Sequence, residues 1–187
     1  PNFFIVGAAK CGTTSMWEYL RLHPKIFMCT PKEPTYFSHI PEVTMSDNRK
    51  INWKEYLNLF ESKNNEVIFG DASTNYLVDP NSAKKIHESI PNAKILIFLR
   101  DPIKRAYSHF IGARPGDPEK PSFKQQLEFE SKNMQNQKIT FNQVLVWGLY
   151  YEQVKRYLDI FGSENVKVLI YEDIFPNNIN DAIKEIL

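Results

Sequence analysis

Short apolar runs alternate with longer amphipathic segments along the chain. The apolar runs at residues 3–6, 67–69, 95–99 and 166–170 are rich in β-branched and aromatic residues. Such nearly continuous runs are typical of strands that are buried on both faces, as in a parallel sheet. We therefore predict strands over these four ranges, joined in βαβ units around a parallel sheet.

The amphipathic segments between these runs predict helices over residues 13–22, 53–61, 82–90, 102–112 and 141–161. Asp101 stands where an N-cap is expected, and Pro102 suits the first helical position. Gly162 is placed as a C-cap for the last of these helices. The stretch from Gly112 to Pro121 is rich in glycine, proline and charge, which predicts a mobile surface loop.

Length and composition indicate an ordinary globular protein. The 187 residues suffice for a single domain over residues 1–187, and the helix-like run at Leu187 suggests that the domain continues beyond it. The net charge of +1 gives no global signal for nucleic acid or an anionic membrane, so any anion site must be built locally. Since no apolar run reaches about 18 residues, we expect no membrane span.

The strongest chemical signal is the sequence Phe4-Ile5-Val6-Gly7-Ala8-Ala9-Lys10-Cys11-Gly12-Thr13-Thr14-Ser15. A buried strand here runs into small residues, one lysine, a glycine and three hydroxyl groups before a helix begins. Backbone N–H groups at a helix N-terminus point outward with partial positive charge and can cradle an anion. Lys10 adds a full positive charge, so the segment predicts a phosphate-binding loop.

This loop differs from a Walker A motif, in which lysine directly follows the last glycine. Lys10 instead precedes Gly12 by two positions, which disfavours a magnesium-dependent NTPase. A generic strand–turn–helix with an exposed lysine is the alternative. A helix N-terminus would lower the pKa of the Cys11 thiol. We nevertheless interpret Cys11 as a small filler of the loop. The four histidines show no metal-ligand spacing and the two cysteines form no zinc pattern, and we predict no metal site.

A second signal spans Arg100 to Ser108. Arg100 follows a predicted buried strand, at the edge where ligands bind in open α/β sheets, and Ser108 lies two turns into the next helix. A guanidinium with a hydroxyl suits a phosphate monoester. The alternative is an ion pair between Arg100 and Asp101 or another acid at the sheet edge.

Together these two segments resemble the two donor-binding motifs of the sulfotransferase family, which uses 3′-phosphoadenosine 5′-phosphosulfate (PAPS). The Lys10–Ser15 loop resembles the 5′-phosphosulfate loop, and Arg100–Ser108 resembles the 3′-phosphate motif. Their order and their separation of 90 residues also fit. The likeness covers essentially the whole chain and is strongest to the branch with heparan sulfate and bacterial sulfotransferases. Residues 148–153 and 168–173 resemble later segments of that branch.

A third segment, Thr30-Pro31-Lys32-Glu33-Pro34-Thr35-Tyr36-Phe37, holds a carboxylate between two prolines. From the residues alone, Glu33 is either fixed in place by the restricted backbone or is a solvated turn acid. The resemblance implies the first interpretation, because related glycan sulfotransferases carry a catalytic glutamate in a Lys-Glu-x-x-x-Phe segment that Glu33 matches. That branch often has histidine where this chain has Thr35.

A fourth segment, Gly70-Asp71-Ala72-Ser73-Thr74-Asn75-Tyr76-Leu77, resembles a family segment on the acceptor side. Some glycan-modifying members carry lysine at the position of Ala72, and its absence argues against a highly sulfated glycan acceptor. Asp71 either positions the acceptor or caps a turn, and the sequence leaves these two roles open.

The resemblance implies an α/β fold of three layers, P-loop-like, with a central and mostly parallel sheet flanked by helices. It also implies an enzyme that transfers a sulfuryl group from PAPS to a hydroxyl or amine of a small-molecule, glycan or carrier-bound acceptor. Glu33 would be the general base. Lys10 would be both catalytic and donor-binding, and the remaining donor-binding residues would be Cys11, Gly12, Thr13, Thr14, Ser15, Arg100 and Ser108.

The alternatives are a P-loop nucleotide kinase-like phosphotransferase and a non-catalytic nucleotide-binding module. We expect neither a nucleic-acid partner nor a metal requirement. Two cysteines and the lack of a visible targeting segment favour the cytoplasm. The Golgi lumen is the alternative, if an anchor precedes this chain.

Overall fold

The structure is a computed structural model that describes residues 1–40, 51–61, 65–113, 115–134 and 138–186. Within these ranges five strands form one sheet in the order β2-β3-β1-β4-β5, and every pairing is parallel. The strands are β1 (Phe3–Gly7), β2 (Ile26–Met28), β3 (Ile68–Ala72), β4 (Lys94–Leu99) and β5 (Val166–Ile170). The predicted α/β class is confirmed.

Helices connect the strands. They are α1 (Thr13–Leu20), α2 (Trp53–Asn58), α3 (Asn75–Val78), α4 (Ser82–Ser89), α5 (Pro102–Ala113), α6 (Phe123–Asn133), the 3₁₀ helix η2 (Val146–Gly148), α7 (Tyr150–Phe161), α8 (Tyr171–Ile174) and α9 (Ile179–Ile186). Asp101 caps α5, since its Oδ1 accepts from the Lys104 N–H at 2.8 Å. Gly162 ends α7 with a φ of 77°. Both predicted caps are therefore confirmed.

One helix prediction and one loop prediction need correction. The predicted helix over residues 141–161 begins at Tyr150, and η2 is the helical turn before it. Trp147 and Val144 lie in this earlier stretch and are buried. Its apolar side chains therefore pack against the interior from irregular backbone and not from a longer helix. The loop was expected over Gly112 to Pro121, but Gly112 lies in the last turn of α5, which extends to Ala113.

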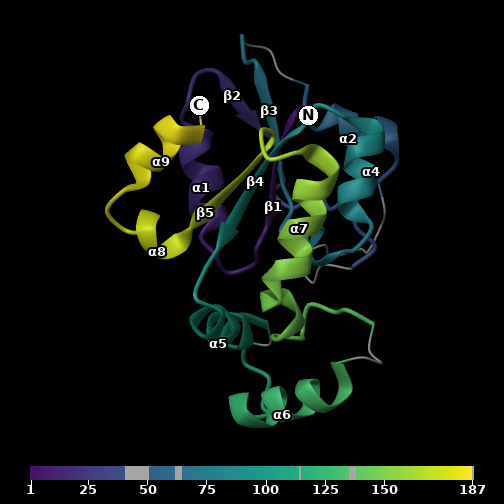
Figure 1. Ribbon diagram of the computed structural model, residues 1–187, viewed down its shortest axis with the longest axis vertical. Coiled ribbons are helices and arrows are strands. Elements are labelled where there is room, and N and C mark those ends of the chain that lie inside the picture. Colours follow the sequence, from purple (N-terminus) through teal and green to yellow (C-terminus); the bar gives the residue numbers. More distant parts are fainter. Residues whose placement is uncertain (41–50, 62–64, 114, 135–137, 187) are drawn as a thin grey trace.

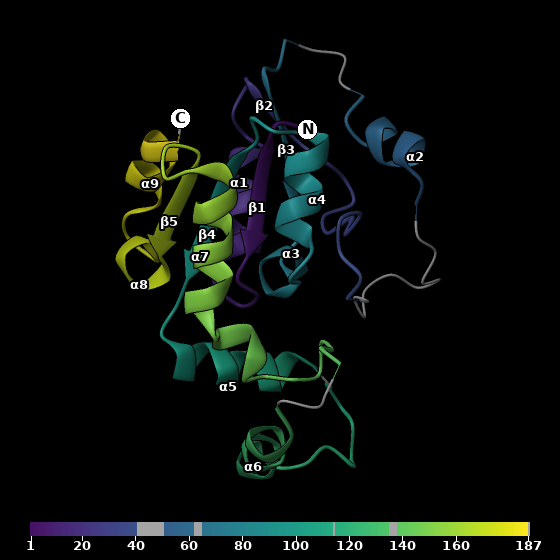
Figure 2. The ribbon, with the colours of Figure 1, turned by 45° about the vertical axis from the view of Figure 1, so that its right-hand side comes forward.

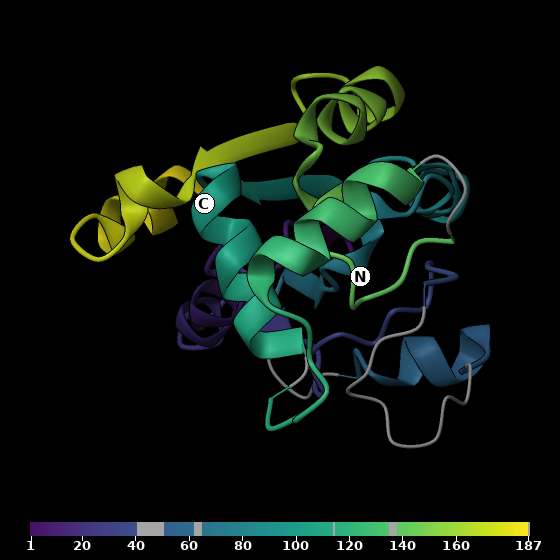
Figure 3. The ribbon, with the colours of Figure 1, turned by 90° about the horizontal axis from the view of Figure 1, so that it is seen from below.

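The sheet lies between two helical layers. Helices α4 and α7 lie side by side over one face, and α1 covers the other (Figure 1). Seen from below, α7 and α1 are on opposite sides of the strands (Figure 3). All five residues of β1 are buried, as expected for a strand covered on both faces. A Cβ on Gly7, at its end, would lie 2.6 Å from the Leu77 Cβ, so glycine is needed there.

The position of β1 determines where a ligand can bind. β1 lies between β3 and β4. The chain builds β2 and β3 on one side of β1 and then crosses to build β4 and β5 on the other side, so the strand order reverses at β1. In open parallel sheets, ligands bind outside the carboxyl ends of the strands at such a point. Helix α5 lies below these carboxyl ends, with α6 beneath it (Figure 2).

Candidate active site

The loop between β1 and α1 has the backbone of an anion cradle. Gly12, the residue before α1, is left-handed with a φ of 82°, and Lys10 is left-handed with a φ of 67°. Thr13 is buried, whereas Thr14 and Ser15 are exposed on the first turn of α1. That turn contains no acidic residue. Its N–H groups have no intrahelical acceptors and can bind an anion.

Gly12 also fits beneath aromatic rings from the C-terminal part of the chain. A Cβ at this position would lie 2.5 Å from Cε2 of Phe175 and 3.1 Å from Cδ2 of Tyr171. The two rings stack on each other with centroids 4.9 Å apart. Glycine therefore serves both the left-handed turn and the close approach of α8.

Arg100 connects the second predicted motif to this loop. Its Nη1 donates to the carbonyl oxygen of Lys10 at 3.1 Å, although the two residues are 90 positions apart. Its guanidinium also lies over the Tyr171 ring at 4.4 Å, and its Nε is 4.0 Å from Oε1 of Glu172. The alternative interpretation of Arg100, an ion pair with an acid at the sheet edge, corresponds to this 4.0 Å contact with Glu172. The structure thus brings the two sequence motifs together.

Ser108 lies on the α5 face that Lys10 contacts. A Cβ on Gly112 would lie 3.1 Å from Nζ of Lys10, so the ammonium lies against this helix. Ser108 precedes Gly112 by four residues and shares its helix face. Ser108 is half-buried. Lys10, Arg100 and Ser108 therefore border one region at the carboxyl end of β1.

A buried network fixes α5 behind the loop. Arg105 is fully buried, donates to the carbonyl oxygen of Val144, and has its Nη1 3.0 Å from Nδ1 of His109. Burial, together with the positive charge of Arg105, lowers the pKa of His109 to about 3. His109 is therefore neutral at physiological pH, and its Nδ1 can accept from Arg105.

The pKa of the Cys11 thiol differs from the prediction. Its Sγ is buried and lies 3.9 Å from the Tyr150 hydroxyl, which itself donates to the Arg100 carbonyl at 3.1 Å. Burial raises the pKa of the Cys11 thiol to about 11, so the predicted lowering is wrong. The thiol is protonated at neutral pH, which agrees with a filler and argues against a nucleophile.

Glu33 lies in the turn after β2 and is held by the end of β3. Its N–H donates to the Ala72 carbonyl at 3.2 Å, and its Oε2 accepts from the Thr74 N–H at 2.6 Å. Its Oε1 pairs with the ammonium of Lys32. The side chain is 13% exposed, so the solvated alternative is wrong. Because β3 lies beside β1, Glu33 and the Lys10 loop occupy the same edge of the sheet.

Asp71 is fully buried and cannot touch an acceptor from solvent. Its Oδ1 accepts from the Ser73 hydroxyl at 2.7 Å, and its Oδ2 accepts from the hydroxyls of Tyr56 at 2.8 Å and Tyr76 at 2.9 Å. Burial raises the pKa of the Asp71 carboxyl to about 6, against the lowering effect of these hydrogen bonds. Whether Asp71 positions the acceptor or caps a turn stays a prediction, and burial leaves only an indirect route to the acceptor.

Three residues that contact the predicted site residues, Thr74, Lys32 and Tyr171, were not predicted from the sequence. The available signal for Thr74 was its place directly after a buried strand, in a run of polar residues at the ligand-binding edge. Tyr171 follows β5, the edge strand beside β4, in the same way.

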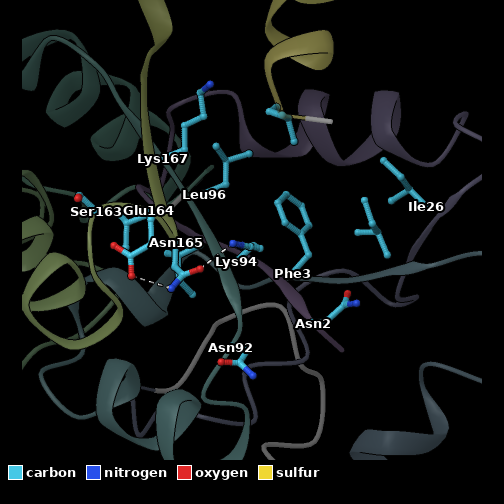
Figure 4. Close-up of a pocket in the computed structure, with 14 residues that line it drawn as sticks. Asn2, Phe3, Ile26, Asn92, Lys94, Leu96, Ser163, Glu164, Asn165 and Lys167 are labelled. Carbon is cyan, nitrogen blue, oxygen red and sulfur yellow. Dashed lines mark hydrogen bonds between the residues drawn. The ribbon is translucent and has the colours of Figure 1, made fainter.

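A cavity of about 690 Å³ lies at the opposite, amino edge of the sheet. Figure 4 shows Phe3 and Leu96 among the side chains that line it, and Lys94, which donates a hydrogen bond to Asn165. It contains none of the predicted site residues, so it is distinct from the candidate active site. In the described ranges, no three His, Cys, Asp or Glu side chains gather into a group that could hold a metal. No helix within those ranges is long and apolar enough to cross a bilayer.

The parallel sheet and the glycine- and hydroxyl-rich loop at the end of its central strand define an α/β protein of P-loop-like architecture. The profile of the family described as "Sulfotransferase domain" matches residues 1–187. The chain therefore belongs to the sulfotransferase domain family, and the predicted resemblance is confirmed.

Known sulfotransferases resemble this chain in structure and in sequence. The crystal structure of a sulfotransferase from Alicyclobacillus acidocaldarius superposes with a TM-score of 0.87 at 36% identity, covering 98% of this chain and 78% of that one. Carbohydrate sulfotransferase 15 of Rattus norvegicus is 26% identical, over 95% of this chain and 41% of the relative. The bifunctional heparan sulfate N-deacetylase/N-sulfotransferase 3 of Homo sapiens is 29% identical, over 100% of this chain and 22% of the relative. The chain thus spans less than half the length of these two curated relatives.

Proposed function

We propose that the protein transfers a sulfuryl group from PAPS to a hydroxyl or amine of an acceptor, with Glu33 as general base. The observation that carries this proposal is the contact between Arg100 and the Lys10 loop, at the strand edge that also holds Glu33. Two cations and a helix N-terminus meet there, which suits a donor with phosphate groups at two positions of its ribose.

The donor would lie across the carboxyl end of β1. The first-turn N–H groups of α1 and the ammonium of Lys10 would bind the 5′-phosphosulfate. Arg100 and Ser108 would bind the 3′-phosphate, which is absent from ATP. Arg100 suits this role because the hydrogen bond of its Nη1 to the Lys10 carbonyl and the Tyr171 ring, 4.4 Å from its guanidinium, hold the cation beside the loop.

Transfer would proceed in line. The acceptor oxygen or nitrogen forms a bond to sulfur as the bond from sulfur to the 5′-phosphate oxygen breaks, and Glu33 accepts the proton that the acceptor loses. Lys10 and the loop N–H groups stabilise the charge that develops on the departing phosphate. Thr74 and Lys32 hold the Glu33 carboxylate in place. The Thr74 hydroxyl lies 3.4 Å from both carboxylate oxygens but can donate its one hydrogen to only one of them, so the other oxygen keeps a lone pair for the proton.

Two alternatives make different predictions. A nucleotide kinase-like phosphotransferase requires magnesium and ATP, and the place of Lys10 before Gly12 argues against it. A non-catalytic module would bind the donor without transfer, and the restrained Glu33 carboxylate argues against that.

The test measures transfer of labelled sulfur from PAPS to desulfated heparan sulfate, a probe chosen because two relatives are named for carbohydrate and heparan sulfate. The PAPS reaction contains a chelator, and a separate reaction with ATP and magnesium, without chelator, serves as the competing condition. We expect transfer by the wild type and a large loss in Glu33→Gln. Phosphoryl transfer from ATP that requires magnesium would overturn the proposal. Tight donor binding without transfer to this probe or to simple phenols and amines would favour the non-catalytic module.

A further inference from the structure

Two hydroxyl groups link the buried Asp71 to the backbone of the turn that carries Glu33. The Ser73 Oγ donates to Asp71 and accepts from the Thr35 N–H at 3.1 Å. The Tyr76 hydroxyl donates to Asp71 and accepts from the Phe37 N–H at 3.4 Å. Both hydroxyls therefore lie between one carboxylate and two backbone amides of the same turn.

The direction of these hydrogen bonds follows from the carboxylate. An ionised carboxylate only accepts, so the hydrogens of both hydroxyls must point at Asp71. Their oxygen lone pairs are then directed away from Asp71 and towards the two N–H groups. Since Asp71, Ser73 and Tyr76 are all buried, water cannot replace these partners without opening the core.

The turn requires such support because its backbone conformation is unfavourable. Glu33 has a φ of 63° and Thr35 a φ of 53°, and neither is glycine. Left-handed backbone is rare for side chains of this kind and persists when the surroundings over-determine it. The amide of Thr35 is one of the groups that the Asp71 network holds.

We propose that Asp71 is a positioning residue, which acts through the hydroxyls of Ser73 and Tyr76 to hold the turn that places Glu33. The inference rests on the proposed role of Glu33 as the base, and it assigns Asp71 no contact with either substrate. The proposal predicts that removing the Ser73 hydroxyl disturbs Glu33 more than removing the hydroxyl of another residue that also donates to the Asp71 carboxylate.

Tyr56 supplies the matched control. Its hydroxyl donates to the same Oδ2 of Asp71 as that of Tyr76, but it comes from α2. Tyr56→Phe keeps the ring stacked 4.6 Å from Tyr36 and removes one buried hydrogen bond to Asp71. Ser73→Ala also removes one such bond, together with the acceptor of the Thr35 amide.

The first readout is deuterium exchange at the amides of Thr35 and Phe37, measured by NMR on the full chain. In Ser73→Ala and in Asp71→Asn we expect exchange at Thr35 to rise about tenfold, the ratio that corresponds to one lost hydrogen bond. Tyr56→Phe should change it less than about twofold. Equal exchange in Ser73→Ala and Tyr56→Phe would overturn the inference, whether or not the protein transfers sulfate.

The second readout is transfer from PAPS in a double-mutant cycle. Ser73→Ala should lower kcat about tenfold with the KM for PAPS within about twofold, and this loss should vanish in the Glu33→Gln background. A merely structural role would lower kcat equally in both backgrounds, which would overturn the positioning role. Absence of transfer in the wild type would reject the proposed function instead, and the exchange measurement would still decide whether Asp71 holds the turn.

Discussion

The loop after β1 and the turn that carries Glu33 lie at the same edge of the sheet, but they are built differently. The loop draws its anion-binding groups from one continuous stretch, with exposed Lys10, Thr14 and Ser15 and the first N–H groups of α1. The Glu33 turn is instead held by the Ser73 hydroxyl and the Thr74 N–H, which lie between β3 and α3, and by the Tyr76 hydroxyl on α3. All three residues are buried. The first region depends on local backbone conformation, and the second depends on long-range hydrogen bonds.

The two regions differ because binding an anion and placing a general base require different kinds of support. An anion is bound by several donors, so the loss of one weakens binding gradually. A general base must be placed within hydrogen-bond reach of one proton, so its surroundings must be rigid. Variants that affect one region and leave the other unchanged can therefore separate the two.

The largest effect is expected from Glu33→Gln, which should lower kcat about 10³-fold through loss of general base catalysis. Affinity for adenosine 3′,5′-bisphosphate should stay within about twofold of the wild type. Steady-state kinetics and calorimetry on the same preparations measure both quantities. A parallel loss of nucleotide affinity would show that the two regions are not separate.

Asp71 should give the protein a measurable pH dependence. Its folded pKa of about 6 lies above the ordinary value of 3.8, so the folded state binds more protons between these values. Its stabilising contribution is therefore complete below about pH 4 and is lost as pH rises through about 6. From pH 7 to pH 4 the wild type should gain about 2 kcal/mol in unfolding free energy relative to Asp71→Asn. Urea denaturation of both proteins tests this, and a constant difference across pH would contradict it.

Gly12→Ala should destabilise the loop region by about 2 kcal/mol, through left-handed backbone and overlap with the Phe175 ring. Gly116→Ala is the matched control, because Gly116 has a φ of 76° but a Cβ added there would have no atom within 4 Å. Thermal unfolding should show a larger decrease for Gly12→Ala. Equal decreases would mean that the ring contact contributes nothing.

The smallest effect is expected from Thr35→Asn. Asparagine tolerates left-handed backbone better than a β-branched residue does, so stability should rise by about 1 kcal/mol. Thr140→Asn, at an exposed position outside the positive-φ set, should stay within about 0.5 kcal/mol. A loss of stability in Thr35→Asn would indicate that the threonine side chain itself supports the turn.

The sequence predicted the frame of the fold well where apolar runs were long. β1, β4 and β5 were predicted to within one residue at each end. β2 was missed because it has three residues at the sheet edge. Helix α6 was missed because its residues are mostly polar and form no apolar stripe, although Ser122 and Gln125 form a capping box that the sequence displays.

The candidate site was predictable to the extent that it is local. The proximity of Lys10 and Arg100 followed from two motifs that each end a buried strand, and the structure places them in contact. The partners of Glu33 could not be predicted, because Thr74 reaches it across 41 positions through the packing of a turn against β3. Burial decided the pKa of Cys11, and burial of a single loop residue is not visible in its sequence neighbours.

The most direct test of the account is the ratio of affinities for adenosine 3′,5′-bisphosphate and AMP, measured by calorimetry with no magnesium. These nucleotides differ only in the 3′-phosphate that Arg100 and Ser108 are proposed to bind. We predict that the bisphosphate binds about 100-fold more tightly, the ratio expected from charge-assisted hydrogen bonds, and that Arg100→Ala removes most of this preference. Equal affinities in the wild type, or ATP binding that requires magnesium, would contradict the account.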